Sequence, residues 1–129
     1  MPKRKKQPEY ELQVKVCEYL KEHYSDVIFL SDTIAQTRLT IPQQVRNKKI
    51  QKEDFHCPDL QIVEARRGYH SLFIELKPKT PYKRNGDLFK NKHLEDQRES
   101  IEDLQAKGFY ACFQWDLDEI KKLIDWYLK

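Results

Sequence analysis

The sequence predicts an α/β fold in which a small mixed β-sheet is flanked by helices. Short runs of strand-forming residues alternate with longer segments whose apolar residues recur at helical spacing. Two of the short runs, 58–63 and 72–77, are separated by a polar break around Gly68, which is typical of an antiparallel hairpin. We therefore expect three layers, with the order helix, three strands, helix, strand and a C-terminal helix (αβββαβ plus one helix).

Length and composition favour one polar globular domain. The chain has 129 residues, of which 39% are hydrophobic and 35% charged. No apolar run is long enough to cross a bilayer, and no signal-like segment follows the basic start. Three cysteines without a Cys-x-x-Cys spacing favour reduced thiols over a disulfide framework or a zinc site. We expect a flexible basic arm over 1–8, a single domain over 9–129 and a cytoplasmic location.

The first helix is expected from Glu9 to about His23, because apolar residues recur between them at helical spacing. Glu9 falls on the extension of the apolar face, where a polar side chain either makes a structural hydrogen bond or serves a site. Glu11 lies on a different face and is the alternative. The run from Val27 to Leu30 then predicts a buried strand.

The segment 33–55 is expected to be irregular and basic, with one helix beginning after Pro42. It is either ordinary surface or a loop that grips a substrate.

The hairpin has an unusual distribution of charge. Asp59 begins its first run, whereas Glu75 and Lys77 end the second and share one face of a strand. Antiparallel pairing therefore gathers all three at one end of the sheet. Two carboxylates there call for a partner, and a hard divalent cation such as magnesium would take oxygens from Asp59, Glu75 and the Leu76 carbonyl. The alternative is a surface ion pair beside a turn-capping aspartate.

The elements after the hairpin end in two helices. A loop over 78–90 precedes a helix that Asn91 caps and Gly108 terminates. Gln97 lies on the apolar face of that helix, where its amide makes either a structural hydrogen bond or a contact in a site. A strand over 109–113 follows, and Asp116 caps the final helix.

These motifs resemble a known family. Pro58-Asp59 followed by Glu75-Leu76-Lys77 at the end of the next strand is similar to the PD-(D/E)XK nucleases. The flanking Ser31-Asp32 and Gly68-Tyr69-His70 resemble the VRR-NUC branch, and the likeness reaches Gln97 and the final helix. Relatives often carry glycine where this chain has Pro42 and Cys57, which puts the local backbone there in question.

The resemblance implies a restriction-endonuclease-like core and assigns roles to individual residues. It implies that Glu9, in the first helix, faces the metal and that Gln97 lies beside the catalytic Lys77. It also implies magnesium or manganese as cofactor, DNA as substrate and, for stand-alone phage or bacterial members, a homodimer that cuts branched DNA such as Holliday junctions. The expected location is then the cytoplasm of a bacterial or phage-infected cell.

The positive charges suit such a substrate by their distribution, since the net charge is only +3. Two internal basic blocks flank the acidic motif, and phosphate binding needs positive charge around catalytic acids. The residues expected to contact nucleic acid are Arg38, Arg46, Lys48, Lys49, Lys83 and Arg84.

The leading interpretation is a metal-dependent DNA endonuclease that recognises structure more than sequence, because no base-reading motif is evident. One rival is a nucleic-acid-binding module with a decayed site, which needs no metal. The other is a glycosidase that uses Asp59 and Glu75 as its acid and nucleophile, although Lys77 and the basic flanks suit a phosphate better than a neutral sugar.

Overall fold

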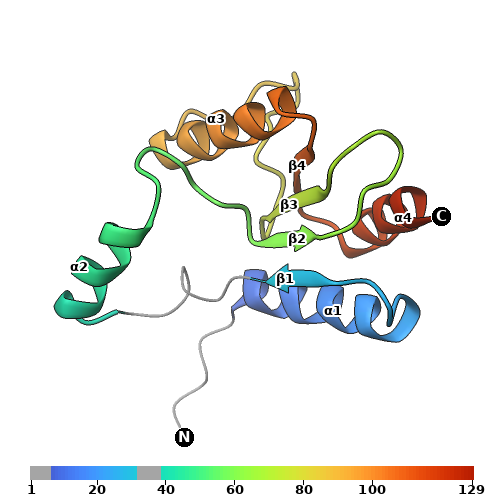
Figure 1. Ribbon diagram of the computed structural model, residues 1–129. Coiled ribbons are helices and arrows are strands. Elements are labelled where there is room, and N and C mark those ends of the chain that lie inside the picture. Colours follow the sequence, from blue (N-terminus) through green and yellow to red (C-terminus); the bar gives the residue numbers. More distant parts are fainter. Residues whose placement is uncertain (1–6, 32–38) are drawn as a thin grey trace, which may run out of the picture.

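The computed structural model describes residues 7–31 and 39–129, which form one mixed sheet and its flanking helices (Figure 1). In chain order the elements are α1 (Pro8–His23), β1 (Phe29–Ser31), α2 (Ile41–Ile50), β2 (Leu60–Ile62), β3 (Leu72–Leu76), α3 (Lys92–Ala106), β4 (Tyr110–Gln114) and α4 (Leu117–Leu128). The strand order is β1-β2-β3-β4, antiparallel except for the parallel pair β3 and β4. The predicted α/β class and the predicted hairpin are confirmed.

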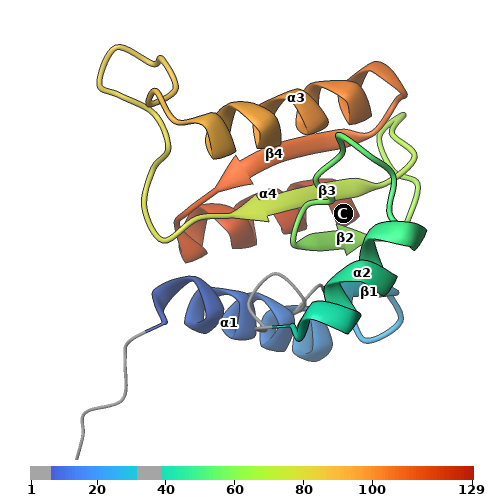
Figure 2. The same cartoon turned by 90° about the vertical axis from the view of Figure 1, so that its left-hand side faces the viewer.

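The two faces of the sheet carry different cores, because successive side chains of a strand point to opposite sides. On one face β2 and β3 pack with α1 and α4, and the fully buried members are Val16, Leu20, Leu60, Ile62, Leu72, Ile74, Leu76, Ile120, Ile124 and Tyr127. On the other face α3 covers β3 and β4 over a smaller core of Phe73, Ile101, Leu104, Ala111 and Phe113. Figure 2 shows α3 and α1 on opposite sides of the sheet.

The helix ends follow the expected local chemistry. Pro8 is the first residue of α1, a position where its missing N–H is no loss. The Asn91 side chain accepts a hydrogen bond from the Leu94 N–H at 3.2 Å and caps α3, as predicted. Gly108 follows α3 with φ +92°, a conformation that side chains disfavour. The crossover from α3 therefore turns directly into β4.

The strand predicted over Val27 to Leu30 is present as β1, but the prediction that it is buried was wrong. Ile28 and Leu30 are 65% and 58% exposed, whereas Val27 and Phe29 pack toward the core. The reason is the position of β1 at the edge of the sheet, beyond the strands that α3 covers. Although the run is apolar throughout, its side chains alternate between a face that packs on the core and a face that nothing covers among the described residues.

The helix expected after Pro42 is present as α2. Thr40 caps it, since its hydroxyl accepts the Gln43 N–H and the Gln43 side chain accepts the Thr40 N–H. It has no buried residue and stands apart from the sheet (Figure 1). Local capping chemistry, rather than packing, therefore defines this helix.

None of the three cysteines is in a disulfide, as expected. Among the described residues, no helix combines the length and the apolar character needed to cross a membrane.

Candidate metal centre

The sheet register places the two motif carboxylates side by side. Leu60 of β2 pairs with Ile74 of β3, so Asp59 and Glu75, the next residues on each strand, stand opposite each other. Both side chains are buried, at 6% and 5% exposure. Glu75 lies on the face covered by α3, because its neighbours on β3 face the other core. The predicted pairing of Asp59 with Glu75 is therefore present.

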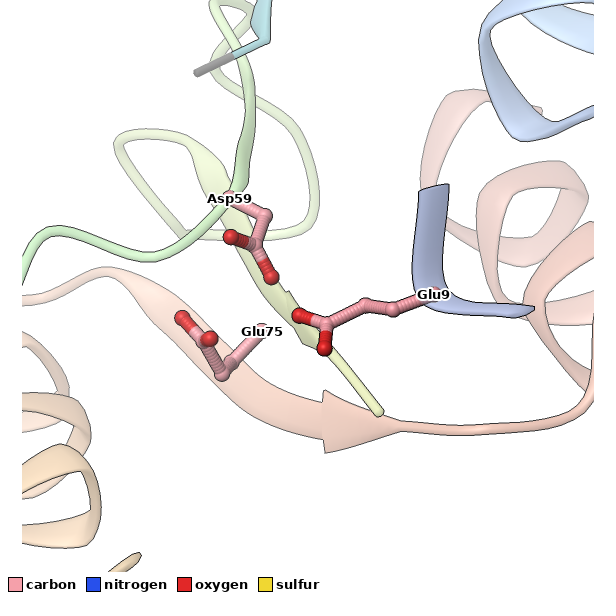
Figure 3. Close-up of side chains that lie close together, drawn as sticks. All are labelled: Glu9, Asp59 and Glu75. Carbon is pink, nitrogen blue, oxygen red and sulfur yellow. The ribbon is translucent and has the colours of Figure 1, made fainter. Parts of the chain in front are cut away.

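A third carboxylate reaches the pair from α1. Oxygens of Glu9, Asp59 and Glu75 all lie within 4.8 Å of one another, and the side chains point toward one another (Figure 3). Glu9 is half-buried, whereas Glu11 is exposed and outside this group. Of the two alternatives in the first helix, Glu9 is thus the one that faces the motif. We call these three residues the carboxylate cluster.

The carboxylate cluster is electrostatically unfavourable without a counterion. Burial, and then the charge of Asp59, raise the pKa of Glu75 well above its ordinary value. The same two causes raise the pKa of Glu9. Lys77 acts in the opposite sense and lowers both pKa values, but it is the smaller influence. A protein that buries like charges in this way stabilises them only when a cation or a proton arrives.

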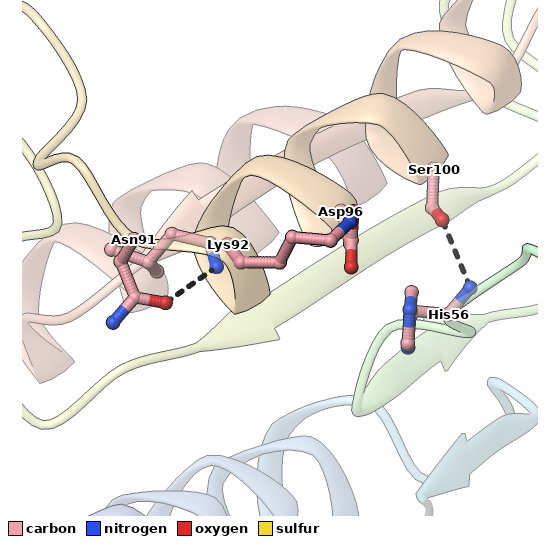
Figure 4. A network of polar contacts seen from close by, with 6 residues as sticks. His56, Asn91, Lys92, Asp96 and Ser100 are labelled. Carbon is pink, nitrogen blue, oxygen red and sulfur yellow. Dashed lines mark hydrogen bonds and ion pairs between the residues drawn. The ribbon is translucent and has the colours of Figure 1, made fainter.

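Backbone contacts hold Asp59 in place. Its Oδ2 accepts a hydrogen bond from the Leu76 N–H at 2.9 Å, which joins the start of β2 to the end of β3. Three residues earlier, the His56 N–H donates to the Ser100 hydroxyl of α3 at 2.9 Å (Figure 4). The segment that carries Asp59 is therefore fixed to both the sheet and the helix. The Leu76 N–H thus contacts Asp59, and the role predicted for the Leu76 carbonyl stays a prediction.

Gln97 makes the contact that its place on α3 implied. Its Nε2 donates to Glu75 Oε1 at 3.0 Å. Its Oε1 is buried and, among the described residues, has no hydrogen-bond partner. A buried amide oxygen without a donor is costly. It therefore indicates that a donor such as a bound water belongs beside Glu75.

Lys77 lies next to the cluster on the α3 face of the sheet. Its N–H donates to the Gln114 carbonyl at 2.8 Å, which extends the β3–β4 ladder by one residue. Its ammonium lies 5.8 Å from the centre of the Phe113 ring. Together with its effect on the pKa values of Glu9 and Glu75, this position makes Lys77 the cation of the site among the described residues.

The donor set fits a divalent cation. It offers carboxylate oxygens and no thiolate, which is the chemistry of hard cations rather than of zinc. The orphaned Gln97 Oε1 is placed to receive a hydrogen bond from water, and hard cations keep several waters. Burial beside Asp59 raises the pKa of Glu75 to about 9, so a cation that binds there displaces a proton that Glu75 would otherwise hold.

Two histidines near Lys77 were missed from the sequence. The rings of His56 and His93 meet edge to face with centroids 5.9 Å apart. Partial burial, and then the charge of Lys77, lower the pKa of His93. The available signal was the spacing, because His93 precedes Gln97 by four residues and so lies on the same side of α3. His56 gave none, since its place depends on the contact with Ser100.

The predicted phosphate-binding residues fall in two separate places. Arg46, Lys48 and Lys49 are exposed on α2. Lys83 and Arg84 are exposed in the loop between β3 and α3. Within the described residues none of these five forms an ion pair with a carboxylate. Arg38 lies outside the described residues.

Removing one charge from the metal-free cluster is expected to stabilise the fold. Glu9→Gln should raise Tm by about 2–3 °C in chelator, because it relieves repulsion that solvent screens at this half-exposed side chain to about 0.5 kcal/mol. The folded-state pKa values of Glu9 and Glu75 are raised, so their contribution to stability is present at acid pH and is lost as pH rises through those values. The gain should therefore be larger at pH 8 than near pH 4, the ordinary range of a glutamate.

Differential scanning calorimetry over this pH range measures the effect, and Glu11→Gln is the matched control. Glu11 belongs to the same helix turn but is exposed, so its substitution should leave Tm unchanged within about 1 °C. Equal shifts for the two variants would show that repulsion in the cluster is not what is being relieved.

Comparison with known proteins supports the fold. No protein-family model matches the sequence, and no curated protein is significantly similar to it. Among solved structures, a VRR_NUC domain protein is similar over 96% of this chain and 90% of its own, with 24% sequence identity and a TM-score of 0.64. This chain therefore has the fold of that VRR_NUC domain protein.

Proposed function

We propose that this protein is a metal-dependent endonuclease that hydrolyses phosphodiester bonds in DNA. The observation that carries the proposal is the juxtaposition of Asp59 and Glu75 with Glu9 and with the Lys77 ammonium. The similarity in fold to a VRR_NUC domain protein supports a nuclease over the glycosidase alternative. A carboxylate cluster with an adjacent cation suits a phosphate, which carries charge that a neutral sugar lacks.

Asp59 and Glu75 would hold the cation directly, with the Leu76 carbonyl as the further oxygen and Glu9 contributing through water. The proposed ion is magnesium or manganese, because both favour carboxylate, carbonyl and water oxygens. When bound, such an ion polarises a phosphate oxygen and lowers the pKa of water.

The protein's own side chains position the reacting groups and transfer protons. Lys77 would orient the attacking water, help to remove its proton and offset the negative charge that develops on the phosphate. Gln97 holds the Glu75 carboxylate and offers its free Oε1 to a water beside it. Attack of the water oxygen on phosphorus breaks one P–O bond, and the departing oxygen takes up a proton. The products are one phosphate end and one hydroxyl end.

Cleavage of supercoiled plasmid and of a four-way DNA junction, each with magnesium or manganese and each with chelator, tests the proposal. We expect cleavage only with the metal, and faster cleavage of the junction than of linear duplex. A protein that binds these DNAs but cuts none of them with either metal would instead be a binding module with an inactive site.

The exposed lysines of α2 are expected to bind DNA phosphates. Lys48→Gln with Lys49→Gln should weaken binding and flatten the plot of log K against log salt by about one to two units, because each phosphate contact contributes roughly 0.9. The loss should be the same for any DNA sequence. Fluorescence anisotropy at several salt concentrations measures it, with exposed Lys107→Gln and Lys129→Gln, beyond α2, as a matched control. An unchanged slope would make Lys48 and Lys49 ordinary surface.

We further propose a homodimer formed through the edge strand β1 in the cytoplasm of a bacterial or phage-infected cell. Ile28 and Leu30 are 65% and 58% exposed there and offer an apolar surface for a second copy. This surface is separate from the lysines of α2 that are expected to bind DNA. Two copies would supply two sites, one for each strand of a branched DNA.

The dimer should be lost in the double variant Ile28→Ser, Leu30→Ser, measured as mass by light scattering. Ile50→Ser is the matched control, since Ile50 is 79% exposed but belongs to α2 and not to β1. A parent protein that runs as a monomer, or equal loss in both variants, would contradict the proposed interface.

A further inference from the structure

A pocket of about 520 Å³ is formed by the loop that follows β3 and by Trp115, which follows β4, and it has no part in the chemistry described above. Its lining residues are Thr80, Tyr82, Lys83, Arg84, Gly86 and Trp115. Two aromatic rings thus face a space that two cationic side chains also border. Neither Lys83 nor Arg84 pairs with a carboxylate among the described residues.

The loop that forms this pocket is internally ordered. Tyr82 and Leu88 make an antiparallel bridge, and the Lys83 N–H donates to the Asp87 carbonyl at 2.7 Å. Gly86 has φ +91° and its N–H donates to the Lys83 carbonyl at 2.9 Å, which closes the turn. The Tyr82 ring is therefore held by a small hairpin, and a ligand need not order the loop in order to bind.

The pocket is attached to the residues that hold Lys77. Trp115 directly follows Gln114, whose carbonyl accepts the Lys77 N–H. On the other wall, Thr80 is three residues from Lys77, so at most about 10 Å of chain separates them. The pocket and the cluster consequently lie at the same end of the sheet, where β3 and β4 terminate.

A continuous row of aromatic rings connects Lys77 with the pocket. The Lys77 ammonium lies over Phe113, Phe113 meets Tyr82 with centroids 6.2 Å apart, and Tyr82 meets Trp115 at 5.8 Å. Trp115, at the end of the row, is 36% exposed and presents its ring to the pocket. A planar group that enters here would extend the row away from Lys77.

This combination suits one chemical class of ligand. A nucleobase is a planar ring that stacks on aromatic side chains, and its phosphate is an anion that lysine and arginine bind. A base inside a duplex keeps its faces stacked on its neighbours and does not offer them to a protein. Only an unpaired nucleotide presents the ring and the phosphate together.

We infer that this pocket binds an unpaired nucleotide of the DNA strand, with its base against Trp115 and Tyr82 and its phosphate against Lys83 and Arg84. The inference rests on the proposed function for the identity of the polymer. It gives a physical basis for selecting structure, because flaps, gaps and single strands carry unpaired bases and intact duplex does not. It also accounts for sequence tolerance, since every base has a face that can stack.

The two tryptophans of the chain allow a direct test without metal or cleavage. The Trp126→Phe variant keeps Trp115 as its single tryptophan, so tryptophan emission reports on the pocket. In chelator, a single-stranded oligothymidine of about ten nucleotides should quench Trp115 with saturation. A blunt-ended duplex of two fully complementary strands and thymidine monophosphate at the same concentration should not. Absence of quenching by the single strand, or equal quenching by the duplex, overturns the inference. Equal quenching by the mononucleotide assigns the pocket to free nucleotides instead and overturns it too.

Affinity gives the second readout. Trp115→Ala should bind the oligothymidine about tenfold more weakly and bind duplex as the parent does, because one stacked base is lost. Trp115→Phe keeps a stacking ring and should retain affinity within about threefold, so a loss in alanine alone excludes a folding effect. Trp126 packs against Arg67, at the far end of the molecule. The Trp126→Phe variant should therefore bind both DNAs with the affinity of the parent.

The two proposals fail separately. If no DNA is cut with metal but Trp115 is quenched by the single strand, the pocket stands and the nuclease does not. If cleavage is normal and Trp115→Ala binds every DNA as the parent does, the nuclease stands and the pocket is not a base-binding site.

Discussion

Glu75→Gln and Asp59→Asn are each expected to lower single-turnover DNA cleavage at least about 10³-fold, since each removes a charged oxygen ligand worth several kcal/mol to the reaction. The protein should nevertheless fold. Both substitutions preserve side-chain volume, and the amide oxygens can still accept from Gln97 and from the Leu76 N–H. DNA binding in chelator should be unchanged or tighter, because a negative charge has been removed.

The measurement combines cleavage, isothermal titration of manganese and melting temperature on the same samples. Glu102→Gln is a suitable control, because Glu102 is an exposed residue of α3 whose carboxylate lies 3.7 Å from the Arg98 guanidinium. It should behave as the parent in all three assays. If Glu75→Gln and Asp59→Asn bind DNA and cleave it at the parent rate, the carboxylate cluster is not the active site.

Lys77→Met is expected to slow cleavage by about 10²- to 10⁴-fold, which is the usual loss for a group that acts on the attacking water or the developing charge. Methionine keeps most of the aliphatic stem over the Phe113 ring, so packing should survive. Metal affinity should be unchanged or slightly higher, because the Lys77 charge opposes that of a bound cation.

The expected results distinguish a catalytic role of Lys77 from a structural one. A lysine that merely pairs with a carboxylate at a strand end contributes about 1 kcal/mol to stability and nothing to turnover. Single-turnover rates at saturating manganese, set beside the free energy of unfolding, distinguish the two roles. Lys77→Arg, which keeps the charge on a bulkier group, should recover part of the rate if charge alone matters. Parent-like cleavage by Lys77→Met would leave Lys77 as a structural residue.

The sequence was sufficient to predict the centre of the site because the chemistry there is local. Asp59 and Glu75 belong to one hairpin, so alternation and antiparallel pairing bring them together without knowledge of the rest of the chain. Gln97 followed from helical periodicity, since an amide on an apolar face requires a partner. Glu9 was ambiguous with Glu11, and only the packing of α1 near the end of β3 decided between them.

Other features depend on contacts between distant segments and could not be derived from local patterns. Whether β1 is buried depends on how far α3 extends across the sheet, and the residues of β1 give no information on this. Trp115 and Tyr82 meet because β4 pairs in parallel with β3, across a crossover of more than thirty residues. Each residue looked like ordinary loop or strand-end composition by itself.

The carboxylate cluster is assembled from separate pieces of chain, and this has a consequence for when the protein becomes active. Glu9 comes from α1, Asp59 and Glu75 from the hairpin, and Gln97 from α3. The Lys77 backbone, moreover, is fixed only once β4 has paired with β3. During synthesis the early segments leave the ribosome before β4 exists, and long-range pairings of this kind form late. A partly made chain therefore lacks a finished site, so under the proposed function a cell that produces this protein would meet no cutting activity until the whole sheet has closed.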